Sequence, residues 1–263
     1  MVRSFASLAA LILSLAAASP SQAAQATADA AAWRDQQVVV TGADGGVGLA
    51  LTRALLAAGA KVTAGSLHMP PSADMQALVA AHAAALSVRQ LDVTDMNSVL
   101  AFRDAAALER VDVLFNLAGV NIDDKRRILQ LPEERLQATF DVNASGPVRM
   151  AQAFYPLLKK SARPKVVNIS SIMGSIADNR IASSVAYRMS KAALNMFTKS
   201  LAIEQPDLLV LSLHPGWVKT SMGGKKAEID ASVSATGILR VVGKAKAAQS
   251  GRFYRYTGEP APW

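Results

Sequence analysis

The chain has 263 residues, of which 51% are hydrophobic, and a formal net charge of +8 at pH 7. A chain of this length and composition can bury the core of a single α/β domain. Because it contains no cysteine, disulfides, thiol nucleophiles and zinc–thiolate sites are excluded. The 28 Lys and Arg residues are scattered along the chain, so we expect no nucleic-acid binding surface, and we predict no metal site.

The first 24 residues have the layout of a targeting peptide. Arg3 precedes an apolar run over residues 8–18, and Pro20 and small residues follow. The run is shorter than the about 20 residues that a membrane span needs, so we expect no stable span after processing. A secretory signal peptide, an uncleaved anchor and an organelle transit peptide stay open as interpretations.

This prediction divides the chain into a targeting peptide (1–24), a linker (25–35) and a folded domain (36–263). The protein is then expected to be exported or delivered to an organelle, and otherwise to be cytoplasmic. The absence of cysteine suits either redox environment.

From residue 36 onward, short apolar runs alternate with helical patterns. Runs typical of buried parallel strands are QVVV (37–40), KVTAGS (61–66), SVRQLDV (87–93), VDVLFN (111–116), KVVNIS (165–170) and LLVLSL (208–213). Helices are predicted over 46–58, 73–84, 96–108, 132–160, 186–204 and 231–246. The alternation predicts an α/β single-domain Rossmann fold. Its doubly wound parallel sheet would have about seven strands, helices on both faces and ligands at the carboxyl ends of the strands.

A glycine-rich loop, TGADGGVG (41–48), follows the first predicted strand and leads into a helix. Gly42, Gly46 and Gly48 allow a tight turn, close approach of a pyrophosphate and close helix packing. The N-terminus of the following helix offers free N–H groups and the positive end of its dipole. The strand before and the helix after the loop favour dinucleotide binding.

Two tyrosine–lysine pairs occur at the i, i+4 spacing that stacks side chains on one helix face. In such a pair the ammonium can stabilise the phenolate and lower the pKa of the tyrosine. Tyr187, paired with Lys191, follows a strand ending in two serines and opens a helix, so its hydroxyl can face the carboxyl edge of the sheet. Tyr155, paired with Lys159, precedes a proline inside a long helical stretch. We therefore predict Tyr187 to be catalytic and Tyr155 to serve packing.

Taken in order, these motifs resemble the classical type of the short-chain dehydrogenase/reductase family. The loop matches its T-G-x-x-x-G-x-G pattern, Asp92 in LDVTD resembles the adenine-contacting acid, and NLAG (116–119) resembles the N-N-A-G turn. Leu117 replaces the usual second Asn, which predicts the loss of one hydrogen bond in that turn. HPGWVKTSMGG (214–224) and SGRFYRYTGEPAPW (250–263) are similar to the C-factor/sniffer-like carbonyl reductase subgroup.

The resemblance implies a role for each matching residue. Tyr187 would be the general acid/base, assisted by Lys191, which also binds the nicotinamide ribose. Ser171 would donate a hydrogen bond to the substrate oxygen, with Ser170 as the alternative, and Asn143 in FDVNASG would hold a proton-relaying water. The cofactor-binding set is Gly42, Asp44, Gly46, Val47, Gly48, Ser66, Asp92, Val93, Asn116, Ala118, Gly119, Tyr187, Lys191, Pro215, Gly216, Val218 and Thr220.

Other segments are expected to complete the site. Residues 172–186, 120–131 and 222–230 would line the substrate pocket. His214, which has no evident acidic partner nearby in the sequence, is expected to be a packed strand-end residue and not a base.

The end of the second predicted strand bears on the choice of cofactor. An NAD enzyme normally carries an acid there and an NADP enzyme a cation, but the chain has Ser66, followed by Leu67. Gly45 replaces the basic residue that NADP-dependent members often carry in the glycine loop. Because the acid is absent and Ser66 and His68 could bond a 2′-phosphate, NADP(H) is favoured over NAD(H).

The function expected from these residues is NADPH-dependent reduction of an aldehyde or ketone to an alcohol by hydride transfer. The alternative from another class is a dinucleotide-binding regulatory or signalling protein with little turnover. A sugar-nucleotide epimerase or dehydratase ranks third, because too little chain follows Lys191 for its substrate region. The expected partners are a small carbonyl or alcohol substrate and a second copy of the chain, in a homodimer or homotetramer formed through the helices at 132–160 and 186–204.

Overall fold

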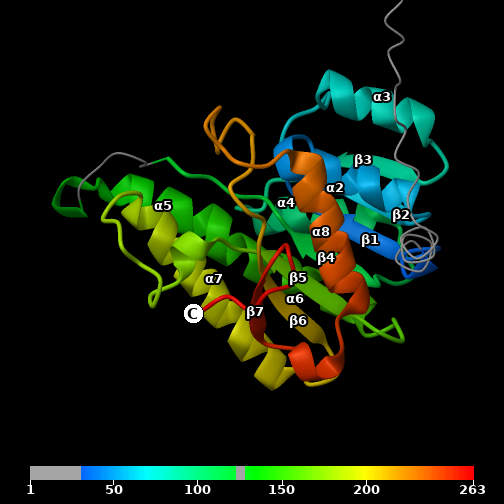
Figure 1. Cartoon of the computed structure of the whole chain (residues 1–263). Helices are drawn as coiled ribbons and strands as arrows, with labels where there is room; N and C mark the ends of the chain where they lie inside the picture. The colour runs from blue at the N-terminus through cyan, green and yellow to red at the C-terminus, as the bar shows by residue number, and fades with distance from the viewer. Residues whose placement is uncertain (1–30, 123–127) are drawn as a thin grey trace, which may run out of the picture.

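The computed structural model describes residues 31–122 and 128–263 (Figure 1). The targeting peptide predicted for residues 1–24 lies outside the described residues. Within them, no helix combines the length and apolar character needed to cross a membrane.

Seven parallel strands form one sheet in the order β3-β2-β1-β4-β5-β6-β7. The strands are β1 (Gln37–Val40), β2 (Lys61–Ser66), β3 (Leu86–Gln90), β4 (Val113–Asn116), β5 (Lys165–Ile169), β6 (Leu209–His214) and β7 (Arg252–Arg255). The predicted α/β class and doubly wound sheet are confirmed. The order reverses between β1 and β4, which is where such sheets bind ligands.

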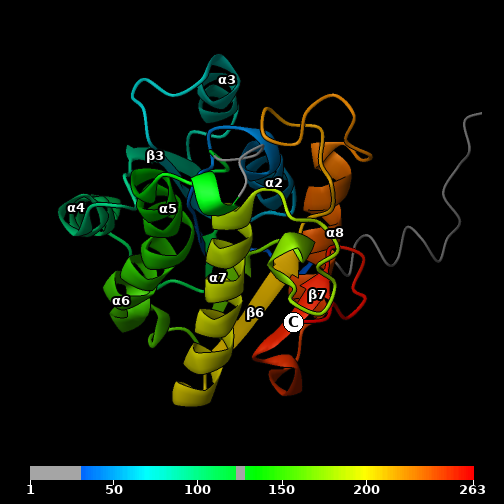
Figure 2. The same ribbon diagram turned by 90° about the vertical axis from the view of Figure 1, so that its left-hand side faces the viewer.

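Helices cover both faces of the sheet, as Figure 2 shows. They are α2 (Gly46–Ala57), α3 (Ala73–Ala81), α4 (Met96–Ala106), α5 (Glu133–Phe140), α6 (Gly146–Leu158), α7 (Val185–Glu204) and α8 (Ala231–Lys244). Two apolar cores lie on opposite faces of the sheet. In one, Leu55 of α2 and Ile238 of α8 pack against the strands. In the other, Phe102 of α4 and Phe154 of α6 do so. Burying apolar area on both faces is the main stabilising term of such a sheet.

The helix predicted over 132–160 is not continuous. A π-helical turn, Asp141–Ser145, separates α5 from α6. Pro147 has no N–H to donate to the carbonyl of Asn143, which disturbs the i to i−4 ladder at this point. The interruption places Asn143 inside the protein, fully buried.

Trp33 lies within the stretch 25–35 that was predicted to be a linker, yet it packs into the core. Its side chain is only 2% exposed and belongs to the core that includes Leu55. The indole stacks on Phe115 with ring centroids 6.1 Å apart, and the Lys165 Nζ lies 5.9 Å from the Trp33 ring. The segment just before β1 is therefore part of the packed domain.

Candidate active site

A cavity of about 260 Å³ opens beside the glycine-rich loop, at the carboxyl ends of β1, β4, β5 and β6. It brings together the two motifs that the sequence singled out, the loop and the Tyr187–Lys191 pair. Its lining consists of Gly42, Gly45, Gly46, Val47, Leu117, Ala118, Gly119, Ile169, Ser170, Tyr187, Lys191, Pro215, Thr220, Ser221 and Met222.

The glycine-rich loop has no room for side chains where it meets its neighbours. Gly42 has a φ of +62°, and a Cβ there would lie 2.7 Å from the Cα of Ala118. A Cβ on Gly48 would lie 2.1 Å from the carbonyl oxygen of Gly42. The loop therefore offers bare backbone at the start of α2, which is the cradle that a pyrophosphate requires.

Thr41 ties this loop to the turn after β4. Its Oγ1 accepts hydrogen bonds from the backbone N–H groups of Leu117 (2.9 Å) and Ala118 (3.0 Å). The Leu117 side chain instead packs against the core. Sequence reasoning did not name Thr41 as a site residue, although its place at the head of the glycine motif was a usable signal.

Lys191 is buried, with 4% of its surface exposed, and its Nζ donates to the carbonyl oxygen of Ile169 at 2.9 Å. Burial lowers the pKa of Lys191 to about 8. The same ammonium lies 5.6 Å from the centroid of the Tyr187 ring.

The predicted lowering of the Tyr187 pKa is wrong for this structure. Burial raises the pKa of Tyr187, and a hydrogen bond with Ser171 offsets only part of that effect. The reason is geometric: the Lys191 ammonium lies over the ring and donates to Ile169, so desolvation of the phenolate dominates.

The two serines after β5 take different directions. Ser171 lies near Tyr187, where it partly counters the effect of burial on the tyrosine pKa, and it accepts from the N–H of Met173 at 3.1 Å, capping the short helix η3 (Ile172–Gly174). Ser170 borders the cavity, but its Oγ is directed to the backbone oxygen of Lys191 at 3.4 Å. Of the two, only Ser171 influences the pKa of Tyr187.

Asn143 links three segments around the cavity. Its Oδ1 accepts from the Val120 N–H at 2.8 Å, while its Nδ2 donates to the Val120 oxygen at 2.8 Å and to the Ser190 Oγ at 3.0 Å. A Cβ on Gly119 would lie 3.3 Å from the Asn143 Oδ1 and 3.5 Å from the Lys191 Nζ. Asn143 is therefore a neighbour of Lys191. Both N–H groups of the Asn143 amide donate to other protein groups, the Val120 oxygen and the Ser190 Oγ.

Further buried polar groups behind the cavity fix α7 to the sheet. The Asn116 Nδ2 donates to the Asn168 Oδ1 at 2.8 Å, and the Asn168 Nδ2 donates to the Thr198 Oγ1 on α7 at 2.8 Å. Sequence reasoning missed Asn168 and Thr198. An asparagine inside the apolar run KVVNI was the available signal.

At the other end of the cleft, Asp44 of the glycine-rich loop meets the end of β2. The Ser66 Oγ lies 3.0 Å from the Asp44 Oδ2 and 2.9 Å from the His68 oxygen. Ser72 donates to the same carboxylate through both its N–H and its hydroxyl. Ser72 was not among the predicted residues, because nothing in the local sequence connects it with a residue 28 positions away.

Several predicted site residues do not line the cavity. Asp92 accepts from the N–H (2.9 Å) and the Oγ1 (2.7 Å) of Thr94, and Val93 packs beneath Gly146. Those outside the lining are Asp44, Gly48, Ser66, Asp92, Val93, Asn116, Asn143, Ser171, Gly216 and Val218.

The segment between β6 and α8, orange in Figure 1, lies beside the start of α2. A Cβ on Gly46 would be 3.0 Å from the Thr220 Cγ2, so Thr220 closes over the glycine-rich loop. His214, at the end of β6, is mostly buried, and burial together with the charge of Arg255 lowers its pKa to about 4. This fits a packed strand-end residue.

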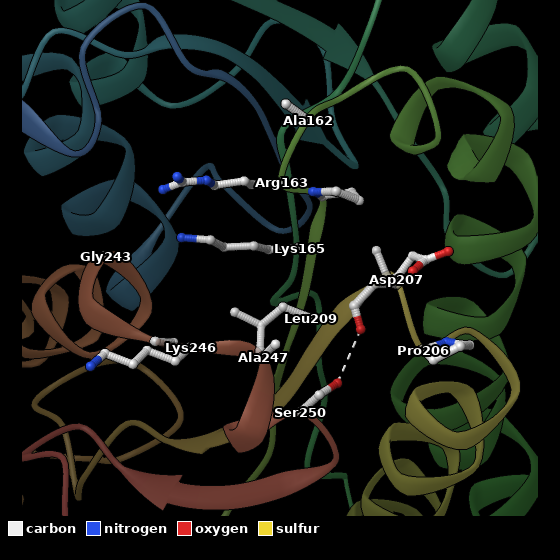
Figure 3. Close-up of a pocket in the computed structure, with 13 residues that line it drawn as sticks. Ala162, Arg163, Lys165, Pro206, Asp207, Leu209, Gly243, Lys246, Ala247 and Ser250 are labelled. Carbon is white, nitrogen blue, oxygen red and sulfur yellow. Dashed lines mark hydrogen bonds between the residues drawn. The ribbon is translucent and has the colours of Figure 1, made fainter.

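A different and larger cavity, of about 370 Å³, lies at the amino ends of β5 and β6 (Figure 3). One of its two lysines, Lys165, donates to the Val242 oxygen at 2.9 Å, and Ser250 donates to the Leu208 oxygen at 3.0 Å. The cavity contains neither the glycine-rich loop nor Tyr187. It also lies at the wrong edge of a parallel sheet for the predicted chemistry.

Tyr155 likewise lies outside the 260 Å³ cavity. Its hydroxyl donates to the Gln205 Oε1 at the end of α7, and the Lys159 Nζ lies 4.9 Å from its ring centroid. Neither contact involves a residue that lines that cavity, and the packing role of Tyr155 stays a prediction.

Comparison with known proteins identifies relatives of this chain. Residues 36–230 match the short chain dehydrogenase family. The chain is 41% identical to C-signal of Myxococcus xanthus over 160 residues, which are 58% of this chain and 93% of that protein.

Solved structures of carbonyl reductases are also similar to this chain. The carbonyl reductase Sniffer of Drosophila melanogaster is 31% identical, with a TM-score of 0.83 over 88% of this chain and 100% of that one. The NADPH-bound carbonyl reductase from chicken fatty liver is 30% identical, with a TM-score of 0.82 over 88% and 95% of the two chains.

Proposed function

The chain belongs to the short-chain dehydrogenase family, and from that premise we propose that it is an NAD(P)(H)-dependent oxidoreductase that reduces an aldehyde or ketone to an alcohol. The observation that carries the proposal is the grouping of Tyr187, the neighbouring Ser171 and the buried Lys191 next to a side-chain-free glycine loop.

The residues present fit a dinucleotide. The bare backbone at Gly42 and Gly48 would hold the pyrophosphate, and Lys191 would bind the nicotinamide ribose. When bound, the nicotinamide supplies the hydride that reduces the carbonyl carbon.

The protein itself supplies the proton. Because burial raises its pKa, the Tyr187 hydroxyl stays protonated at neutral pH and can donate to the carbonyl oxygen as negative charge develops there. Ser171 would donate a second hydrogen bond to that oxygen, where a fixed donor contributes most. The Lys191 ammonium would then stabilise the phenolate that proton donation leaves behind.

NADP(H) is our proposed cofactor. Support comes from the chicken carbonyl reductase, whose structure has NADPH bound, and from a Burkholderia multivorans protein with bound NADP that is 27% identical to this chain. The end of β2 carries Ser66 in place of the acid typical of NAD enzymes.

A homodimer or homotetramer formed through the helices α5, α6 and α7 is part of the proposal. Two side chains at a seven-residue spacing on α7, Met196 and Ile203, are 67% and 70% exposed. Such a stripe is suited to pairing with a second copy.

A dinucleotide-binding regulatory protein is the second candidate, and the likeness to C-signal favours it. The two candidates differ in turnover: a regulator would bind the dinucleotide but leave carbonyl compounds unreduced.

The test is oxidation of NADPH and NADH against a panel of aldehydes, ketones and quinones. We expect Tyr187→Phe to lower kcat by about 10²–10⁴-fold, the usual contribution of a general acid. Tyr155→Phe, the same change in the other tyrosine–lysine pair, should leave kcat unaltered. Equal activity of Tyr187→Phe and the wild type would refute the assignment, and dinucleotide binding without any turnover would favour the regulator.

A further inference from the structure

The end of β2 lacks its own acid, yet a carboxylate is present there. Asp44 reaches it from the glycine-rich loop, and the Asp44 Oδ2 lies 3.0 Å from the Oγ of Ser66, which is only 1% exposed. Sequence alignment of the motifs cannot show this contact, because the two residues come from different segments. The absence of an acid at position 66 favoured a phosphorylated cofactor, but the Asp44 carboxylate supplies the missing negative charge at the same place.

The same carboxylate engages a second serine. The Ser72 N–H lies 2.9 Å from the Asp44 Oδ1 and 3.1 Å from the Oδ2, and the Ser72 Oγ lies 2.7 Å from the Oδ1. Ser72 is also the N-cap of α3. Asp44 thus occupies two hydroxyl donors that could otherwise bond a 2′-phosphate.

No ion pair neutralises Asp44 in the part of the chain that the structure describes. His68 presents its backbone oxygen to this cluster, which is a further acceptor. Gly45 next to it contributes no side chain, and a Cβ there would meet nothing within 4 Å. The surroundings of Asp44 therefore suit hydroxyl groups better than a dianion.

We propose that Asp44 is a specificity-determining residue for the adenosine end of the cofactor: its carboxylate accepts a hydrogen bond from a free ribose 2′-hydroxyl and repels a 2′-phosphate. The inference rests on the proposed dinucleotide function but revises its cofactor: Asp44 favours NAD(H), against the NADP(H) that Ser66 and the relatives support. Two charges about 4 Å apart, even in a high dielectric, change the affinity for a doubly charged phosphate by at least about tenfold.

The experiment uses ligand fragments, so that it needs no turnover. Binding of 2′,5′-ADP and of 5′-AMP is measured by calorimetry for the wild type and for Asp44→Asn, which keeps the shape of the side chain and removes its charge. We expect Asp44→Asn to bind 2′,5′-ADP at least about tenfold more tightly, with 5′-AMP bound no more tightly than before.

Two further variants sharpen the result. Asp74→Asn removes an equal charge from the exposed first turn of α3, without any contact to Ser66, and should leave the affinity ratio unchanged. Gly45→Arg adds a cation where space is open and the backbone is extended, and should raise the affinity for 2′,5′-ADP further when combined with Asp44→Asn. Thermal unfolding of each variant checks that the fold is kept.

The outcomes separate the two claims. If Asp44→Asn gives the same ratio as Asp74→Asn while both fragments bind, the inference is overturned and the proposed function stands. If neither fragment binds the wild type or any variant, the dinucleotide site itself is refuted, and the inference with it.

Discussion

The two ends of the cleft are built differently. At the proposed catalytic end, defined by Asn143, Ser171, Tyr187 and Lys191, all side chains but that of the partly exposed Tyr187 are buried, and Asn143 and Lys191 bond to the backbone of neighbouring segments. At the adenosine end the bonds join Asp44 to two serines, one of them on an exposed loop. The core therefore fixes the geometry of the first end. The adenosine end depends on the charge of Asp44 and on its hydrogen bonds, which substitutions can alter without disturbing the core.

The largest expected effect is at Asn143. Replacing it with Leu removes three hydrogen bonds and leaves the N–H and oxygen of Val120 without these partners, at a cost of about 2–4 kcal/mol in the free energy of unfolding. Because Gly119 and Lys191 adjoin it, we expect kcat to fall by about 100-fold or more. Chemical denaturation and steady-state kinetics measure the two effects. Wild-type stability in Asn143→Leu would show that the catalytic end is not held in this way.

An intermediate effect concerns Lys191 and pH. Burial disfavours its ammonium, so in the free protein the charge is present below a pKa of about 8 and lost above it, while the raised pKa of Tyr187 keeps that residue protonated. The kcat/KM for carbonyl reduction should therefore be level below pH 8 and fall by about tenfold per pH unit above it. A kcat/KM that stays constant up to pH 10 would contradict the prediction that the charged Lys191 ammonium is required.

The smallest effect is expected at the adenosine end. Ser72→Ala removes an exposed N-cap and one partner of Asp44, and should lower the free energy of unfolding by about 1 kcal/mol or less. Affinity for 5′-AMP should be unchanged, since Asp44 keeps its contact with Ser66. A loss as large as that of Asn143→Leu would remove the distinction between the two ends.

Most strands of the sheet could be predicted from the sequence, because buried parallel strands consist of continuous runs rich in β-branched residues. The bounds of β1 and β2 match the predictions, and the other predicted strands differ at their ends by up to three residues. The break at Asp141–Ser145 was not predictable from periodicity, since a π-turn adds one residue without interrupting the helical pattern.

Within the site, the order of the motifs predicted Tyr187 and not Tyr155 as the catalytic residue, and of the two only Tyr187 lines the cavity beside the glycine-rich loop. The direction of the Tyr187 pKa could not be obtained in this way, because it depends on burial and on where the Lys191 ammonium points. The contact of Asp44 with Ser72 was equally invisible, because it joins residues that only the fold brings together.

Trp33 sets a limit on how much of the N-terminal segment can be removed. Its indole fills the space against Phe115 under the sheet, so a proteolytic cut or truncation beyond it would open a hole in the core. Losing a buried tryptophan typically costs about 3–5 kcal/mol, a large part of the stability of an average domain. Any maturation that yields a stable enzyme must therefore cut the chain before this residue.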